Sequence, residues 1–228
     1  MSSNTNPSSS NQLAVVFDMD GVIADTNPFH AKAFERFFDK YQVAYSQEAF
    51  EKHMYGKHNS YIMQHFFGRK MSSDEIKKLE AEKEGLFREI YKSIATPVNG
   101  LVTFLEDLKR NNFKLGVATS APKANMDLVL DALNIRSFFD STLSSEDVIL
   151  HKPHPEVYLK SAEVLSVSVE DVMVFEDSFS GVTAGLSAGM SVTGVLTSHS
   201  KDELPPCAAY IRDYRDTNAS TIKSLLKK

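Results

Sequence analysis

Two aspartates one residue apart, Asp18 and Asp20, follow a short apolar run and are followed directly by Gly21. The run, residues 13–17, is too short for a helix and contains β-branched residues, which predicts a buried parallel strand. In open α/β sheets, ligands bind just beyond the carboxyl ends of the strands. Side-chain alternation puts the two aspartates on one side, so we expect both carboxylates to face one reacting group.

Paired carboxylates at a strand end repel each other unless a cation or hydrogen-bond donors offset the repulsion. Mg²⁺ prefers oxygen ligands and is commonly held by one or two carboxylates together with a substrate phosphate. A carboxylate can also attack phosphorus and form an aspartyl-phosphate. The alternative is structural: Asp18 and Asp20 end a strand and cap the next helix.

Polar pairs also occur at three later points of the chain. The apolar run 114–118 ends on Thr119-Ser120, and the apolar run 171–175 ends on Glu176-Asp177. Lys152-Pro153 lies between them. Each pair therefore comes after or near a strand-like run, as the first two aspartates do.

This order of motifs resembles the haloacid dehalogenase superfamily of phosphohydrolases. Within it, the chain is similar to the β-phosphoglucomutase-like branch. The similarity lies in Val-Phe-Asp-Met-Asp-Gly-Val-Ile-Ala-Asp-Thr at 16–26 and Val-Phe-Glu-Asp-Ser-Phe-Ser-Gly-Val-Thr-Ala-Gly at 174–185. The resemblance covers about residues 11–215 and implies a helical cap that closes over the site of a phosphoryl-transfer enzyme.

The resemblance assigns the chemical steps to the first two aspartates. Asp18 is then the nucleophile, and its place at a strand end permits in-line attack on phosphorus. Asp20 is the general acid that protonates the departing oxygen and the general base that activates water, since the two steps reverse roles. Asp18 and the Asp20 backbone carbonyl would bind the metal. The alternative for Asp20 is a second metal carboxylate without a proton role.

The later motifs complete the implied site. Asp177 would bind Mg²⁺ directly, and Glu176 would bind it directly or support its ligands; the alternative for both is capping of the next helix. Thr119, Ser120 and Lys152 would bind the transferring phosphoryl oxygens, because hydroxyl and N–H groups at a strand–helix junction form an anion site. The alternative for Lys152 is a solvated lysine.

Four residues are expected on the substrate side of the site: His30, Lys57, Asn59 and Asn125. His30 would contact the leaving group or assist Asp20, and its alternative is a surface histidine. Two departures from the family pattern matter. His151 replaces the glycine that usually precedes the lysine, and no arginine occurs at 55–60, where the mutases grip their second phosphate. Lys57 lacks the bidentate fork of an arginine, which favours a phosphatase over a mutase.

The pattern of elements predicts an α/β fold, a Rossmann-like parallel sheet with helices on both faces. Residues 27–94 contain no strand-like run and are predicted to form the helical cap, with Asn27 as N-cap of the first helix. The sheet domain is predicted over 13–26 and 95–228, and residues 1–12, which are polar and low in complexity, as a disordered tail. A long charged helix is predicted from Ser72 to about Ile94.

The chain has 228 residues, 42% of them apolar, a net charge of −5 and a single cysteine. The charge does not favour nucleic acid, and no apolar run approaches the roughly 20 residues of a membrane span. No secretory signal is evident and no intrachain disulfide can form, so we expect a cytoplasmic protein. The resemblance implies a monomer.

We therefore predict a Mg²⁺-dependent phosphatase of a small phosphate monoester, with a sugar phosphate as the preferred class. The first alternative is a hexose phosphomutase of the β-phosphoglucomutase type. The second is a protein that binds a phosphorylated ligand without turnover. A pyrophosphatase and a phosphonate-cleaving enzyme are further alternatives. The phosphonate-cleaving enzyme fits less well, since no cap lysine for a Schiff base is identified.

Overall fold

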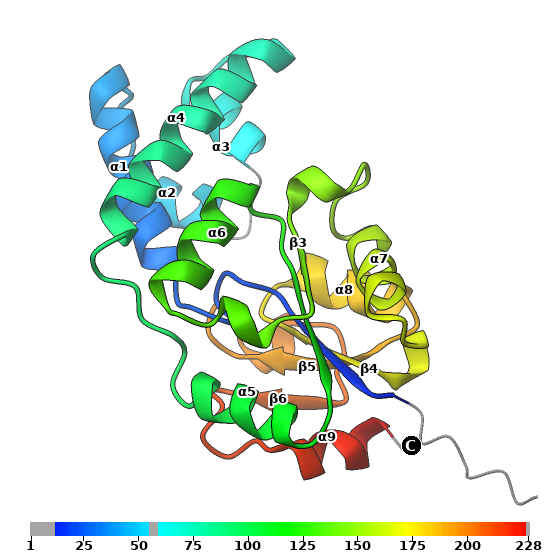
Figure 1. The fold of residues 1–228 in the computed structure, drawn as a ribbon. Coiled ribbons are helices and arrows are strands. Elements are labelled where there is room, and N and C mark those ends of the chain that lie inside the picture. The colour runs from blue at the N-terminus through cyan, green and yellow to red at the C-terminus, as the bar shows by residue number, and fades with distance from the viewer. Residues whose placement is uncertain (1–11, 55–58, 227–228) are drawn as a thin grey trace, which may run out of the picture.

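A six-stranded parallel sheet forms the centre of the computed structural model, which describes residues 12–54 and 59–226 (Figure 1). The strand order is β3-β2-β1-β4-β5-β6. The strands are β1 (Ala14–Phe17), β2 (Lys114–Ala118), β3 (Ser141–Leu143), β4 (Val172–Glu176), β5 (Ser191–Val195) and β6 (Ala209–Ile211). Since β1 pairs in parallel with both β2 and β4, the carboxyl ends of these three strands lie together. The predicted Rossmann-like α/β fold is confirmed.

Helices cover both faces of the sheet, because successive side chains of a strand point to opposite sides. Val15 and Phe17 pack toward α5, α6 and α9, whereas Ala14 and Val16 pack toward α7 and α8. These helices are α5 (Leu101–Arg110), α6 (Lys123–Ala132), α7 (Glu156–Leu165), α8 (Phe179–Ser187) and α9 (Ala219–Leu226). The sheet is therefore the middle of three layers.

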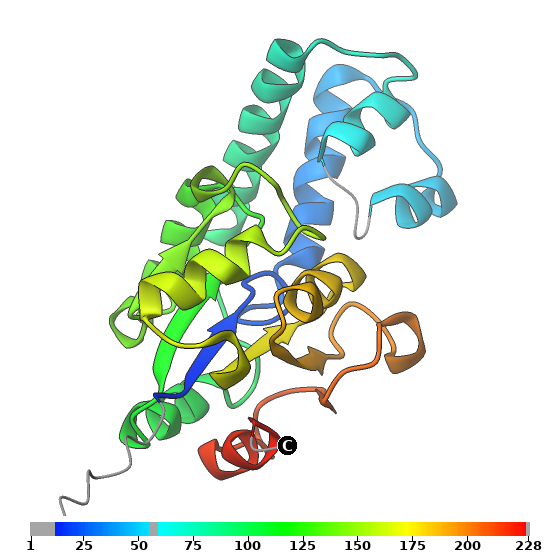
Figure 2. The same ribbon diagram turned by 90° about the vertical axis from the view of Figure 1, so that its right-hand side faces the viewer.

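Four helices follow β1 and form a separate layer above the sheet (Figures 1 and 2). They are α1 (Asn27–Tyr41), α2 (Gln47–Met54), α3 (Asn59–Phe66) and α4 (Ser73–Tyr91). A hydrophobic cluster of their own, centred on Phe34, Phe37 and Phe38, holds them together. The chain leaves and re-enters the sheet layer at one place, where Ala24 pairs with Pro97 in an antiparallel bridge. The proposed division into a cap over 27–94 and a sheet domain stays a prediction.

Two local predictions in these helices are wrong. Asn27 is not the N-cap of α1: Thr26 holds that place and makes no side-chain cap hydrogen bond. Tertiary partners compete for both side chains, because Thr26 donates to Asp20 and Asn27 donates to Ser198. The predicted long helix ends earlier, at Tyr91.

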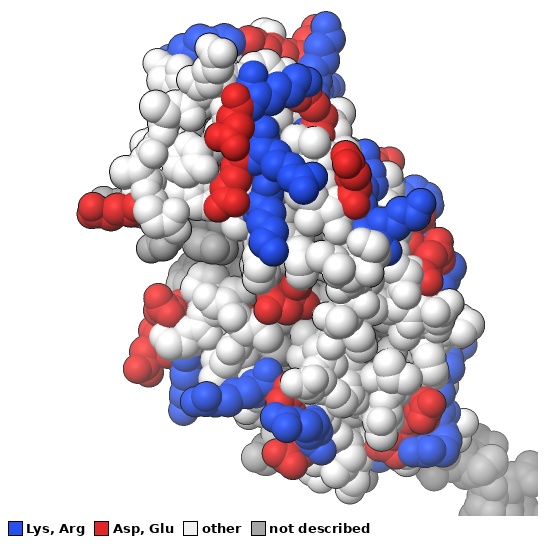
Figure 3. All heavy atoms as spheres, turned by 90° about the vertical axis from the view of Figure 1, so that its left-hand side faces the viewer, with Lys and Arg blue, Asp and Glu red and all other residues white. Residues whose placement is uncertain are grey.

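The surface carries mixed charge. On the face drawn in Figure 3, acidic and basic side chains lie interspersed, so neither sign dominates that face. Within the described ranges, no helix combines the length and the apolar character needed to cross a membrane.

Candidate active site

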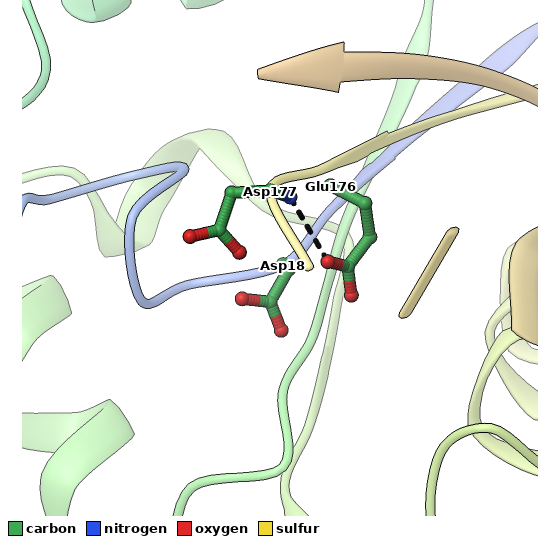
Figure 4. A group of neighbouring side chains, drawn as sticks. All are labelled: Asp18, Glu176 and Asp177. Atoms are coloured by element: carbon green, nitrogen blue, oxygen red, sulfur yellow. Dashed lines mark hydrogen bonds between the residues drawn. The ribbon is translucent and has the colours of Figure 1, made fainter. Parts of the chain in front are cut away.

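Three buried carboxylates meet at the carboxyl ends of β1 and β4 (Figure 4). Asp18 follows β1, Glu176 is the last residue of β4, and Asp177 follows it. One oxygen from each of the three lies within 4.8 Å of the others. Neighbouring parallel strands thus bring together residues that are more than 150 positions apart in the chain.

Lys152 is the cation of this cluster. Its buried ammonium group donates to Asp18 Oδ1 at 2.6 Å, to Glu176 Oε1 at 2.7 Å and to the carbonyl of Ala118 at 2.9 Å. Burial alone would lower the pKa of Lys152, but the charges of Asp18 and Glu176 outweigh it and raise that pKa well above its ordinary value. Lys152 is therefore a buried ion-pair partner and not a solvated lysine, and the His151 replacement does not keep it from the site.

Negative charge still exceeds positive charge in this cluster. Burial, only partly offset by Lys152, raises the pKa of Asp18 to about 8. Burial and the neighbouring charges of Glu176 and Asp18 raise the pKa of Asp177 well above its ordinary value. Oxygen donors with uncompensated negative charge are the set that a hard divalent cation such as Mg²⁺ requires, so the residues present fit that ion.

Glu176 is the most heavily bonded of the three carboxylates. Besides Lys152, Tyr158 donates its hydroxyl to Oε1 at 2.8 Å. The Oε2 atom accepts the backbone N–H groups of Asp177 and Ser178, at 3.0 and 3.2 Å. A carboxylate offers about four lone-pair sites, and these donors occupy them.

Asp20 lies beside the cluster with its carboxyl turned toward the helical layer. Thr26 donates a hydrogen bond to Asp20 Oδ1, and His30 Nε2 lies 3.5 Å from the same atom. The ammonium group of Lys83 donates to His30 Nδ1 at 2.8 Å. Since Nδ1 accepts, the neutral imidazole carries its proton on Nε2, the atom that faces Asp20. The ring of His30 stacks on Phe87 at 3.8 Å.

The turn after β2 contributes the expected hydroxyl groups. Thr119 is buried and its Oγ1 accepts the backbone N–H of Ala121 at 3.0 Å, which shapes the turn into α6. Ser120 is exposed. Both line the same cavity as Asp18 and Lys152.

The substrate-side residues gather around Glu84 of α4. Asn59 donates its amide to Glu84 Oε1 at 2.7 Å, and Asn125 donates to Oε2 at 2.6 Å. Asn125 is fully buried and its Oδ1 accepts from Arg88 at 2.8 Å, so its amide already has partners on both sides. Burial is the strongest single effect and opposes ionisation of Glu84, but Lys83 and the other neighbours that favour the ionised form together outweigh it and lower the pKa to about 2. Lys57 lies outside the described residues.

The sequence analysis assigned no role to three residues of the long charged helix that line the cavity, Lys83, Glu84 and Arg88. Lys83 and Glu84 are buried together with Leu79 and Phe87. Lys83 lies four residues from both apolar side chains and Glu84 lies three residues from Phe87, which places the pair along the apolar face of the helix. That spacing was the available signal for a buried charged pair. Tyr158 and Ser198 carried no such signal.

A cavity of about 1230 Å³ separates the helical layer from the sheet. Its wall includes Asp18, Asp20 and Thr119 from the sheet side and Glu84 and Arg88 from α4. The carboxylate cluster and the hydroxyl-bearing turn therefore share a space with groups of the helical layer.

Comparison with known proteins agrees with this geometry. Residues 15–195 match the haloacid dehalogenase-like hydrolase family. A phosphorylated carbohydrates phosphatase of Thermotoga maritima is 36% identical over 189 residues, which cover 81% of this chain and 86% of that protein. The β-phosphoglucomutase of Bacillus subtilis is 30% identical over 192 residues, covering 80% and 82% of the two chains. A haloacid dehalogenase hydrolase of family IA from Entamoeba histolytica has a TM-score of 0.89 at 26% identity, covering 95% and 100%. The chain thus belongs to the haloacid dehalogenase-like hydrolases and is an enzyme of that family.

Proposed function

We propose that this enzyme is a Mg²⁺-dependent phosphatase of small phosphate monoesters, with phosphorylated carbohydrates as its substrate class. The observation that carries the proposal is the buried Asp18 carboxylate. It lies 2.6 Å from Lys152, within a group of carboxylates that fits a divalent cation, on the wall of a large cavity. The Thermotoga maritima and Bacillus subtilis relatives, a phosphatase and a mutase of phosphorylated sugars, support the substrate class.

In the proposed reaction, Asp18 attacks phosphorus and forms an aspartyl-phosphate. Lys152 directs all three of its N–H bonds to Asp18, Glu176 and Ala118, so it orients the nucleophile and adds positive charge next to the transferring group. Thr119 and Ser120, with the N–H groups of their turn, would receive the phosphoryl oxygens. Bound Mg²⁺ would supply charge neutralisation between the carboxylates and the phosphoryl group.

Asp20 would protonate the leaving oxygen and then take a proton from the attacking water. Thr26 and the Nε2–H of His30 both face its carboxyl group and so set its direction. We assign Asp177 and Asp18 to the metal, together with the Asp20 carbonyl. Glu176 is a supporting residue in this assignment, because its oxygens already accept hydrogen bonds from Lys152, Tyr158 and the backbone.

A phosphomutase is the second candidate, and one observation favours it. Arg88 lines the cavity from α4, although no arginine occurs at 55–60. A mutase must hold a second phosphate, and a guanidinium is suited to that task. Arg88 is however already hydrogen-bonded to Asn125, which favours the phosphatase.

The deciding experiment is Mg²⁺-dependent phosphate release from a panel of sugar phosphates, nucleotides and pyrophosphate. We expect release from sugar monophosphates, and a loss on the order of 10³-fold or more in Asp18→Asn. If nothing is released, conversion of glucose 1-phosphate to glucose 6-phosphate with a bisphosphate primer would establish the mutase. Saturable binding of the phosphorylated compounds without either reaction would leave a non-catalytic binding protein.

A further inference from the structure

The loop that follows β5 contacts the acidic cluster, although the proposed chemistry does not use it. Thr197 donates its hydroxyl to the carbonyl of Gly21 at 2.6 Å. Ser198 donates its hydroxyl to Asp177 Oδ2. His199 Nδ1 lies 2.9 Å from the backbone carbonyl of Asp177 and donates to it. Three consecutive side chains therefore hold the turn after Asp20 and both the backbone and the carboxylate of Asp177.

A second contact sets the direction of the Ser198 hydroxyl. Asn27 Nδ2 donates to Ser198 Oγ at 2.6 Å. Because a hydroxyl has one proton, a group that accepts from Asn27 can give that proton to Asp177. Asn27 is the first residue of α1, so this chain of two hydrogen bonds runs from the helical layer to a carboxylate of the sheet layer.

The space around Asp177 makes the direction of its carboxylate sensitive to these contacts. A Cβ atom on Gly21 would lie 2.0 Å from Asp177 Oδ2, so the carboxylate sits directly against the backbone of that turn. Gly21 has a φ of +76°, a conformation that glycine adopts without strain. Holding Oδ2 between Ser198 and Gly21 fixes the rotation of the carboxylate and so the direction of Oδ1.

We infer that Ser198 is a positioning residue for the divalent cation and that Asn27 acts through it. This rests on the proposed cation site at Asp18 and Asp177. Groups that orient a metal ligand typically change metal affinity by 10–100-fold when they are removed. Because Asn27 is the first residue of α1, its hydrogen bond to Ser198 also makes the affinity for the cation depend on the position of α1.

The test measures Mn²⁺ binding to the full-length protein by electron paramagnetic resonance of the free ion, without substrate. Mn²⁺ takes the same oxygen ligands as Mg²⁺. We expect Ser198→Ala to weaken binding roughly 10-fold or more, Asn27→Ala to weaken it less, and Ser198→Thr, which keeps the hydroxyl, to retain affinity. Ser200→Ala is the matched control, because Ser200 lies in the same loop but donates to Glu203.

Unchanged Mn²⁺ affinity in Ser198→Ala would overturn the inference, as would equal weakening in Ser200→Ala, which would indicate a general effect on the loop. A parallel Mg²⁺ titration of phosphate release should show a raised Mg²⁺ requirement with most of kcat recovered at saturating ion. Because the Mn²⁺ measurement needs no turnover, the absence of phosphatase activity would contradict the proposed function without deciding this inference.

Discussion

Lys152 shows how one residue determines the charge balance of the candidate active site. It is buried between Asp18 and Glu176, and it also donates to a backbone carbonyl. A buried ion pair contributes little net stability when it is complete, because desolvation offsets the attraction. Removing one partner is different, since it leaves charge in the interior without compensation.

We predict that Lys152→Met lowers the free energy of unfolding by about 3–5 kcal/mol in the absence of divalent cations. The methionine fills the space of the lysine stem but leaves Asp18 and Glu176 without a cation. Urea unfolding at neutral pH measures the effect. Lys78→Met, at an exposed position of α4, is the control and should change the value by no more than about 0.5 kcal/mol. Equal stability of the two variants would contradict this account of Lys152.

At the scale of elements, Glu84 joins three helices through its carboxylate. It lies on α4 and accepts hydrogen bonds from Asn59 of α3 and Asn125 of α6. Lys83, next to it, also reaches His30 of α1. Lys83 and the hydrogen-bond donors around Glu84 favour the ionised carboxylate, and together they outweigh the effect of burial on its pKa.

The lowered pKa of Glu84 makes the free energy of unfolding depend on pH. The pKa of Glu84 is about 2 in the folded chain, against 4.5 as the ordinary value. A lowered folded pKa gives stability that is present above pH 4.5 and is lost as the pH falls toward 2, at most about 3 kcal/mol. In Glu84→Gln this loss of stability at acid pH should disappear. Urea midpoints between pH 5.5 and 3 measure it, and Glu163→Gln, exposed on α7, should keep the native profile.

The approach of α8 to the site depends on a glycine. A Cβ atom at Gly181 would lie 1.7 Å from Glu176 Oε1, so any side chain there must displace the helix or the carboxylate. The N-terminal turn of α8 can therefore sit directly on Glu176, where Ser178 caps the helix by accepting from Gly181 N–H at 3.1 Å.

We predict that Gly181→Ala destabilises the protein by about 1–3 kcal/mol through overpacking and lowers activity with it. Thermal unfolding and phosphate release measure the two effects. Gly85→Ala is the matched control in α4, since its nearest neighbour to a new Cβ lies at 3.9 Å. There alanine should be neutral or stabilising by up to about 1 kcal/mol. If Gly181→Ala changed stability and activity as little as Gly85→Ala, the close approach of α8 to Glu176 would not be required.

At the scale of the whole molecule, the cavity lies between the sheet and the helical layer. The helical layer has a hydrophobic cluster of its own, although Ala33, Phe87 and Tyr91 join the cluster of the sheet. Its volume of about 1230 Å³ exceeds the range of roughly 300–1,000 Å³ that is usual for small-ligand pockets. A small phosphate ester would leave much of this space to water, which weakens the electrostatic contacts between the site and the transferring group.

We therefore predict that the helical layer approaches the sheet when the site is filled. Mg²⁺ with tetrafluoroaluminate, a mimic of a transferring phosphoryl group, should reduce the radius of gyration in small-angle X-ray scattering. Asp18→Asn, which lacks the nucleophile, should show no such change. An unchanged radius in the native protein under saturating conditions would mean that the open cavity is the working form.

The sequence by itself determined the α/β class, because apolar runs of strand length alternate with helical patterns and end on polar pairs. The order of its motifs and their resemblance to a known family also predicted that Asp18, Asp177 and Lys152 share one site, and the structure places Lys152 beside Asp18 and Asp177 in the same group of carboxylates. Only the tertiary structure decided what surrounds them. Hydrogen bonds from Ser198 and Tyr158 join segments distant in the chain, and burial of Lys83 beside Glu84 depends on which face of α4 packs inward. Such contacts follow from the packing of elements, which local spacing does not specify.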